Sequence, residues 1–224
     1  MAGMKKGIFI AIVVVVGGYV LLCLGLYEWG LRARPDAFRT PPAVLPPALV
    51  EQVAAMEKLG QQAMPRMDPI TLLPRSWLGA GSQQRNSGWQ STIATTSQFR
   101  AHRPGDQIHG ARRHFAEMAD AVYLSRHWTR EQVLSARANA AYYGRDAHGL
   151  DTAAQAWYGM PLTQLQPAEI TALWTLQWAP PSVDPFCHHD RFAKRYAMLA
   201  KRVQGVDPAD TQAAIDRMSA TVCR

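Results

Sequence analysis

An uncharged apolar segment near the N-terminus constrains this chain more than any other feature. Residues 7–27, GIFIAIVVVVGGYVLLCLGLY, contain no charged side chain over 21 positions. As a helix, a segment of this length crosses the roughly 30 Å of hydrocarbon in a bilayer. A cleaved signal peptide has a shorter apolar core and small residues at its cleavage site, whereas EWGLRARPD follows here. We therefore expect an uncleaved anchor over residues 7–28, preceded by a cytoplasmic tip over residues 1–6.

The side of the membrane on which the rest of the chain lies is not set by charge. The positive-inside rule counts Lys and Arg near the ends of a span, and these residues flank the anchor on both sides. Cys187 and Cys223 are the cysteines outside the anchor. They could pair in an oxidising compartment or remain two separate thiols.

After the anchor we expect a linker over residues 29–48 and one folded domain over residues 49–224. Five prolines within residues 32–48 are typical of an extended, semi-rigid spacer. The domain has apolar residues at helical spacing and no strand-like alternation, so the expected fold class is mainly α. A net charge of +7 favours anionic partners, but no motif that reads nucleic acid is present.

Local signals predict where helices begin and end. The apolar spacing predicts a helix over residues 49–64. Thr129 and Gln132 form a capping box at the start of a helix that Gly144 is expected to end. The predicted N-caps of the last two helices are Asp190 and Asp207.

Several short motifs follow one another along the domain. Glu57 and Asp68 stand eleven residues apart, like the outer residues of the pattern E-D-x-x-F-x-x-H-x-G-x-D. Arg113 and Glu117 match the ends of R-K-x-x-E. Asn139 closes VLSARAN, which stands in the place of I-L-E-x-Y-L-N.

The stretch SGWQSTIATTSQFR, residues 87–100, stands in the place of the pattern G-x-S-T-I-T-Q-Q-L-x-K-N. It keeps S-T-I, replaces both glutamines with threonine and replaces the lysine with phenylalanine.

A longer match begins at Gly149. The segment GLDTAAQAWYGMPLTQLQPAEITALWTLQWAPPSVDP follows G-x-x-x-A-A-x-x-Y-F-G-K-x-x-x-x-L-x-x-x-E-x-A-x-L-A-x-x-x-x-A-P-x-x-x-x-P with small shifts near its end. Over about residues 50–203, the chain resembles the peptidoglycan glycosyltransferases of family 51, the polymerase domain also found in penicillin-binding proteins. It looks like a divergent member of the monofunctional branch. The resemblance implies a lysozyme-like helical glycosyltransferase domain behind one N-terminal transmembrane helix.

The resemblance also implies a reaction. Family members polymerise lipid II: a sugar hydroxyl of the acceptor attacks the anomeric carbon of the donor, and polyprenyl pyrophosphate leaves. Such a step needs a base for the hydroxyl proton and groups that stabilise the departing pyrophosphate. By resemblance Glu57 is the base, and Glu117 is the second glutamate, near the pyrophosphate or a bridging divalent cation, Mg²⁺ or Mn²⁺. The implied substrate-binding residues are Asp68, Ser91, Thr92, Thr95, Thr96, Arg100, Arg113 and Asn139.

The same resemblance implies partners and a location. The expected partners are lipid II, the growing glycan strand, the inner membrane and other cell-wall synthesis proteins. The expected location is the bacterial inner membrane, single-pass, with the domain on the periplasmic face.

Two alternatives stay open beside the active polymerase. The altered motif positions also fit a catalytically degenerate relative that binds lipid II or peptidoglycan, or that scaffolds a cell-wall assembly. A lytic enzyme of the lysozyme-like class would need one acidic residue, but the match beyond Gly149 disfavours it.

Overall fold

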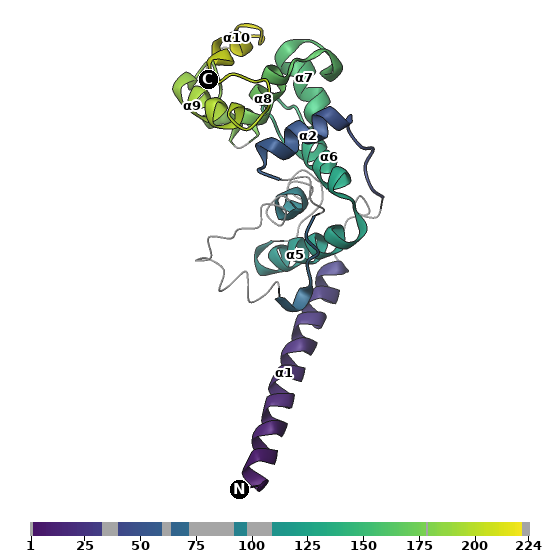
Figure 1. The fold of residues 1–224 in the computed structure, drawn as a ribbon. Coiled ribbons are helices and arrows are strands. Elements are labelled where there is room, and N and C mark those ends of the chain that lie inside the picture. The colour runs from purple at the N-terminus through teal and green to yellow at the C-terminus, as the bar shows by residue number, and fades with distance from the viewer. Residues whose placement is uncertain are drawn as a thin grey trace.

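The structure is a computed structural model, described for residues 2–32, 40–59, 64–71, 92–97, 109–177 and 179–220. These residues are mainly helical (Figure 1). Their one β-pairing is an isolated antiparallel bridge between Tyr142 and His148. The predicted fold class is therefore confirmed.

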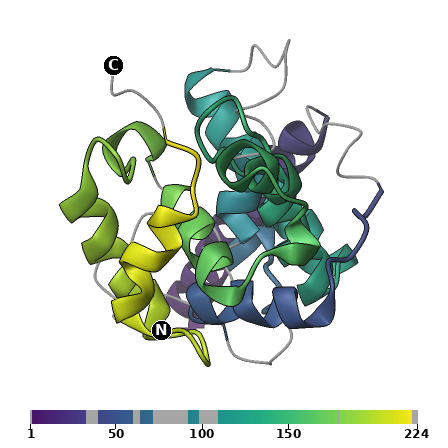
Figure 2. The ribbon, with the colours of Figure 1, turned by 90° about the horizontal axis from the view of Figure 1, so that it is seen from above.

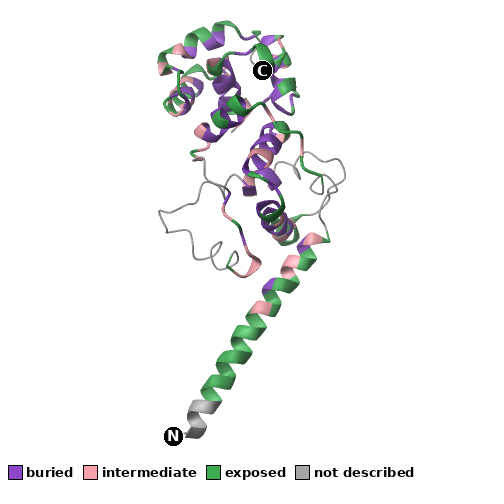
Figure 3. Cartoon of the chain, turned by 45° about the vertical axis from the view of Figure 1, so that its right-hand side comes forward, coloured by how far each residue is buried: buried purple, intermediate pink, exposed green. Residues whose placement is uncertain are grey.

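Helix α1 (Ala2–Leu31) is longer than the predicted anchor at both ends. In the described part of the chain it is the one helix long and apolar enough to cross a membrane, over Gly7–Leu31. Its surface is exposed along most of its length and becomes partly buried near its C-terminal end (Figure 3). Exposed apolar side chains on an isolated helix are unfavourable in water, so this surface suits a lipid environment.

Helix α2 (Pro47–Met56) is shorter than the helix predicted over residues 49–64. It begins with proline at its first turn, where the missing N–H costs nothing. It ends at Met56, and Glu57 is its C-cap. The next residue, Lys58, has φ of 60°, a left-handed conformation that ends the helix.

Helices α5 (Gly110–His127) and α6 (Arg130–Ala140) follow. The predicted capping box is confirmed, because Thr129 accepts the Gln132 N–H and the Gln132 side chain accepts the Thr129 N–H. The prediction that Gly144 ends α6 is wrong. The helix already ends at Ala140, since Ala141 is extended. Gly144 lies beyond it with φ of 82°.

The C-terminal part consists of short helices. Asp207 caps the first turn η5 by accepting the Ala209 N–H, as predicted. Asp190 lies inside the first turn of α9, whose N-cap is His188, so that N-cap prediction is wrong. The elements are α7 (Leu150–Tyr158), η3 (Leu162–Gln164), α8 (Pro167–Leu176), η4 (Pro180–Ser182), α9 (His189–Ala200), η5 (Pro208–Asp210) and α10 (Thr211–Asp216).

The helices form a domain at one end of α1. Figure 1 shows α5 next to the C-terminal end of α1, with α2 and α6 beyond it and α7 to α10 farthest from the N-terminus. Seen from above, α9 and α10 gather on one side of the domain (Figure 2). The main core joins α2, α6 and the C-terminal helices, and its largest fully buried members include Trp157, Trp174, Tyr143, Tyr196 and Phe192.

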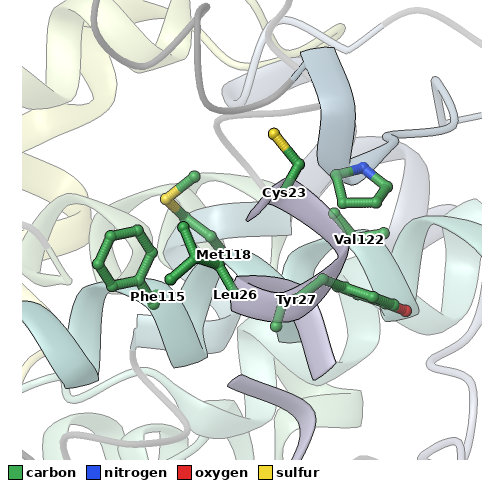
Figure 4. Close-up of a pocket in the computed structure, with 8 residues that line it drawn as sticks. Cys23, Leu26, Tyr27, Phe115, Met118 and Val122 are labelled. Carbon is green, nitrogen blue, oxygen red and sulfur yellow. The ribbon is translucent and has the colours of Figure 1, made fainter. Parts of the chain in front are cut away.

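A second, smaller core joins the domain to α1. It contains Met67, Met118 and Val122, and Tyr27 of α1 packs against it. Figure 4 shows Cys23, Leu26 and Tyr27 on the α1 side of this contact, facing residues of α5. The last turns of α1 are thus part of the folded domain.

Candidate functional site

Glu57 lies where the end of α2 meets α6 and α8. Its side chain is 17% exposed. Its Oε1 atom accepts two hydrogen bonds, from Arg137 Nη2 at 3.0 Å and from Trp174 Nε1 at 3.2 Å. No described residue donates to Oε2. One oxygen of the carboxylate is therefore held by two side chains of the protein.

Positive charge collects around this end of α2. Arg202 Nη1 donates to the Met56 carbonyl at 2.7 Å, which satisfies one of the free carbonyls at the helix C-terminus. Burial lowers the pKa of the Arg195 guanidinium, and the negative charge of Glu57 opposes that shift. With Arg137, three arginines from α6, α9 and the residues after α9 therefore lie at this end of α2.

Tyr143 is fully buried next to Arg137 and Glu57. Burial raises its pKa well above the usual range, and its hydroxyl donates to the Ala138 carbonyl at 3.1 Å. A phenol in this state is not an acid or base near neutral pH. Tyr143 is a fully buried packing residue.

Glu117 lies on α5 in a second cluster. Its Oε1 atom accepts from Arg113 Nε at 2.9 Å and from Ser97 Oγ at 3.2 Å. The Glu117 side chain is 13% exposed and that of Arg113 is 38% exposed. As at Glu57, one carboxylate oxygen is engaged, and no described residue donates to the other.

Residues 92–97 form a short helix against α5. Thr92, Thr95 and Thr96 are almost completely buried. The Thr96 hydroxyl contacts the backbone carbonyls of Ile93 at 2.8 Å and Glu117 at 3.3 Å. These threonines hold the segment on α5, while Ser97 is the hydroxyl that reaches the Glu117 carboxylate.

The remaining predicted residues are more dispersed. Asp68 caps the turn that follows it, accepting the N–H groups of Ile70 and Thr71. Partial burial acts to raise the pKa of Asp68, but these hydrogen bonds outweigh it, so the pKa is lowered. Asn139 is exposed on α6. The predictions for Ser91 and Arg100 lie outside the described residues.

The structure thus assembles two carboxylate clusters. The contacts to the Glu57 carboxylate come from α6 and α8, and those to Glu117 come from α5 and residues 92–97. Among the described residues, no hydrogen bond or ion pair joins the two clusters. In the same part of the chain, no group of three His, Cys, Asp or Glu side chains could hold a metal ion.

The sequence did not identify four residues that take part in the two clusters. Arg137 and Trp174 contact Glu57, Gln177 contacts Arg137, and Ser97 contacts Glu117. Arg137 carried a signal: it falls on the same face of α6 as the buried Val133. A charged residue on an apolar helix face needs a buried partner. The identity of that partner, 80 residues earlier in the chain, is a property of the fold.

Comparisons with known proteins give one consistent result. A family model described as transglycosylase matches residues 37–204. The chain is 33% identical over 89 residues to penicillin-binding protein 1A of Mycolicibacterium smegmatis, covering 40% of this chain and 11% of that protein. It is 29% identical over 96 residues to penicillin-binding protein 1A of Pseudomonas aeruginosa, covering 43% and 12%.

A third relative aligns over a longer part of the chain but at lower sequence identity. Penicillin-binding protein 1A of Rickettsia prowazekii is 23% identical over 159 residues, which cover 71% of this chain and 20% of that protein. The chain therefore spans a fifth or less of the length of these three relatives.

Proposed function

The chain belongs to the transglycosylase family, and from this premise we propose that it is a peptidoglycan glycosyltransferase that polymerises lipid II. The observation that carries the proposal is the family match, which spans residues 37–204 and includes both glutamates. The similar relatives named penicillin-binding protein 1A support a role in the cell wall.

In the proposed reaction Glu57 is the base. The acceptor hydroxyl gives its proton to Oε2 of Glu57, the hydroxyl oxygen bonds to the donor anomeric carbon, and the bond from that carbon to the pyrophosphate oxygen breaks. The geometry supports this role because Oε1 is already held by Arg137 and Trp174. A fixed carboxylate loses less freedom when it meets the reacting hydroxyl.

Arg113 is proposed to stabilise the leaving pyrophosphate. Its guanidinium is partly exposed and is held by Glu117 through one nitrogen, Nε. The other nitrogens can donate to phosphate oxygens, a geometry that suits arginine. A divalent cation would further neutralise the pyrophosphate when bound, and its requirement is tested by chelation and re-addition of Mg²⁺ or Mn²⁺.

Two features, helix α1 and the disulfide-bonded Cys187, indicate on which side of which membrane the reaction takes place. Lipid II stays in the bilayer through its lipid tail, so an anchored domain meets it there. Cys187 is disulfide-bonded, which is typical of an oxidising compartment. We propose the periplasmic face of the inner membrane. Protease added to spheroplasts should digest the domain, and full protection of the domain would overturn this orientation.

A second candidate function is binding of lipid II without turnover. The burial of Thr95 and Thr96 favours it, because side chains in the place of the two glutamines do not reach solvent. The two candidates separate in one experiment on purified full-length protein in detergent. An enzyme converts labelled lipid II into glycan that a muramidase degrades, whereas a non-catalytic relative binds lipid II and leaves it unchanged.

A further inference from the structure

Arg137 is a buried charge that no sequence motif accounts for. It lies in the last turn of α6 and is 8% exposed. Its neighbours on the helix, Val133, Leu134 and Ala138, are fully buried. In the pattern I-L-E-x-Y-L-N, to which VLSARAN corresponds, this position is occupied by tyrosine. Burial of a charge destabilises a fold unless a partner compensates it, so the contacts of this arginine are informative.

The contacts of Arg137 converge on Glu57. Its Nη2 atom donates to Glu57 Oε1 at 3.0 Å and to Gln177 Oε1 at 3.2 Å. Its guanidinium carbon lies 5.9 Å from the ring centroid of Trp174, whose N–H donates to the same Glu57 oxygen. One arginine therefore fixes the carboxylate directly and packs against the second group that fixes it.

A packing role alone does not explain this residue. The Nε and Nη1 atoms of Arg137 are buried with no hydrogen-bond partner among the described residues. Buried donors without partners destabilise a fold, and an apolar side chain of similar size often replaces a buried ion pair without loss of stability. The buried Arg137 guanidinium thus lowers the stability of the fold, and its one ion pair in the described part of the chain is with Glu57.

We propose that Arg137 is a positioning residue for the reaction, which holds the Glu57 carboxylate by Oε1 so that Oε2 is in place to accept the acceptor's proton. This inference rests on the proposed function, because it assigns the orientation of the proposed base. Arg137 acts through the Glu57 carboxylate that it contacts.

Arg130 supplies a matched control on the same helix. It is 6% exposed and pairs with Glu51 through two hydrogen bonds, at 2.8 Å and 3.2 Å. Arg130→Met therefore removes an equally buried arginine from an ion pair that does not involve Glu57. Both variants lose an ion pair, but only Arg137→Met leaves Glu57 without its main contact.

The first test is steady-state polymerisation of lipid II by the full-length protein. Arg137→Met should lower kcat at least 10-fold while KM changes less than 3-fold, because orientation of the base matters in the transition state. Arg137→Lys should recover part of kcat, and millimolar guanidinium should raise the activity of Arg137→Ala. Arg130→Met should keep kcat near that of the wild type. A wild-type kcat in Arg137→Met overturns the inference while the proposed function stands.

The second test does not need turnover. Thermal unfolding is compared for the wild type, Arg137→Met, Glu57→Leu and the double variant. If the two side chains interact as described, Arg137→Met lowers Tm less in the Glu57→Leu background, which has no acceptor at this position, than in the wild type. Equal losses in both backgrounds overturn the inference. If the wild type makes no glycan, the proposed function fails, and the catalytic role of Arg137 fails with it.

Discussion

Gly30, in the last turn of α1, lies so close to Ala119 of α5 that an added Cβ would be 2.6 Å from the Ala119 Cβ. It would also lie 2.8 Å from the Phe115 carbonyl oxygen. Because Cβ atoms do not approach so closely, only glycine allows this contact. The membrane helix and the helix that carries Glu117 are therefore packed against each other at backbone distance.

This contact predicts that Gly30→Ala destabilises the domain. Overpacking of a close contact costs about 1–3 kcal/mol, so Tm in detergent should fall by several degrees. Gly25→Ala is the control, since nothing lies within 4 Å of a Cβ added at Gly25. Equal Tm values for the two variants would show that α1 is not packed on α5 in solution.

The second prediction concerns Arg113. If its guanidinium stabilises the leaving pyrophosphate, Arg113→Gln should lower the initial rate of lipid II consumption about 100-fold, the magnitude typical for loss of one such donor. Arg191→Gln removes the same charge from an exposed position on α9 and should leave the rate unchanged. Equal rates for both variants would exclude Arg113 from the site.

The third prediction concerns the pH dependence of stability. The folded state lowers the pKa of Asp68, so it binds a proton there less readily than the unfolded chain does. The stabilisation is present above about pH 4, the ordinary pKa of an aspartate, and is lost as the pH falls through the lowered value. The Tm difference between the wild type and Asp68→Asn should therefore be larger at pH 7 than at pH 3.

The control for Asp68 is Asp190→Asn, because the Asp190 side chain is fully exposed. Its effect on Tm should be small at both values of pH. A difference between the wild type and Asp68→Asn that grows as the solution is acidified would contradict the described hydrogen bonds.

Helices could be predicted from the sequence where local signals act. The capping box at Thr129 and Gln132 forms as its residue types require, because both partners lie within one turn. The end of α2 could not be predicted this way. It depends on the left-handed conformation of Lys58 and on contacts that Glu57 makes with α6 and α8. The residue in the left-handed conformation is a lysine, whereas the sequence rule looks for glycine at such a position.

The two acidic residues of the candidate site could be proposed from the sequence, but the side chains that contact them could not. Glu57 and Glu117 stand at motif positions, so their residue types and spacing point to them. Arg137 reaches Glu57 across 80 residues and Ser97 reaches Glu117 across 20. Those contacts follow from helix packing, which periodicity and composition do not encode.

Polymerisation of lipid II by the purified full-length protein, measured beside Glu57→Gln, tests the central claim most directly. Gln retains the shape of the side chain and an oxygen that can accept from Arg137 and Trp174, but it is not a base. The wild type should form glycan that a muramidase digests, and Glu57→Gln should form none while it still binds lipid II. Wild-type protein that binds lipid II without forming glycan, or Glu57→Gln that polymerises at the wild-type rate, would contradict the account.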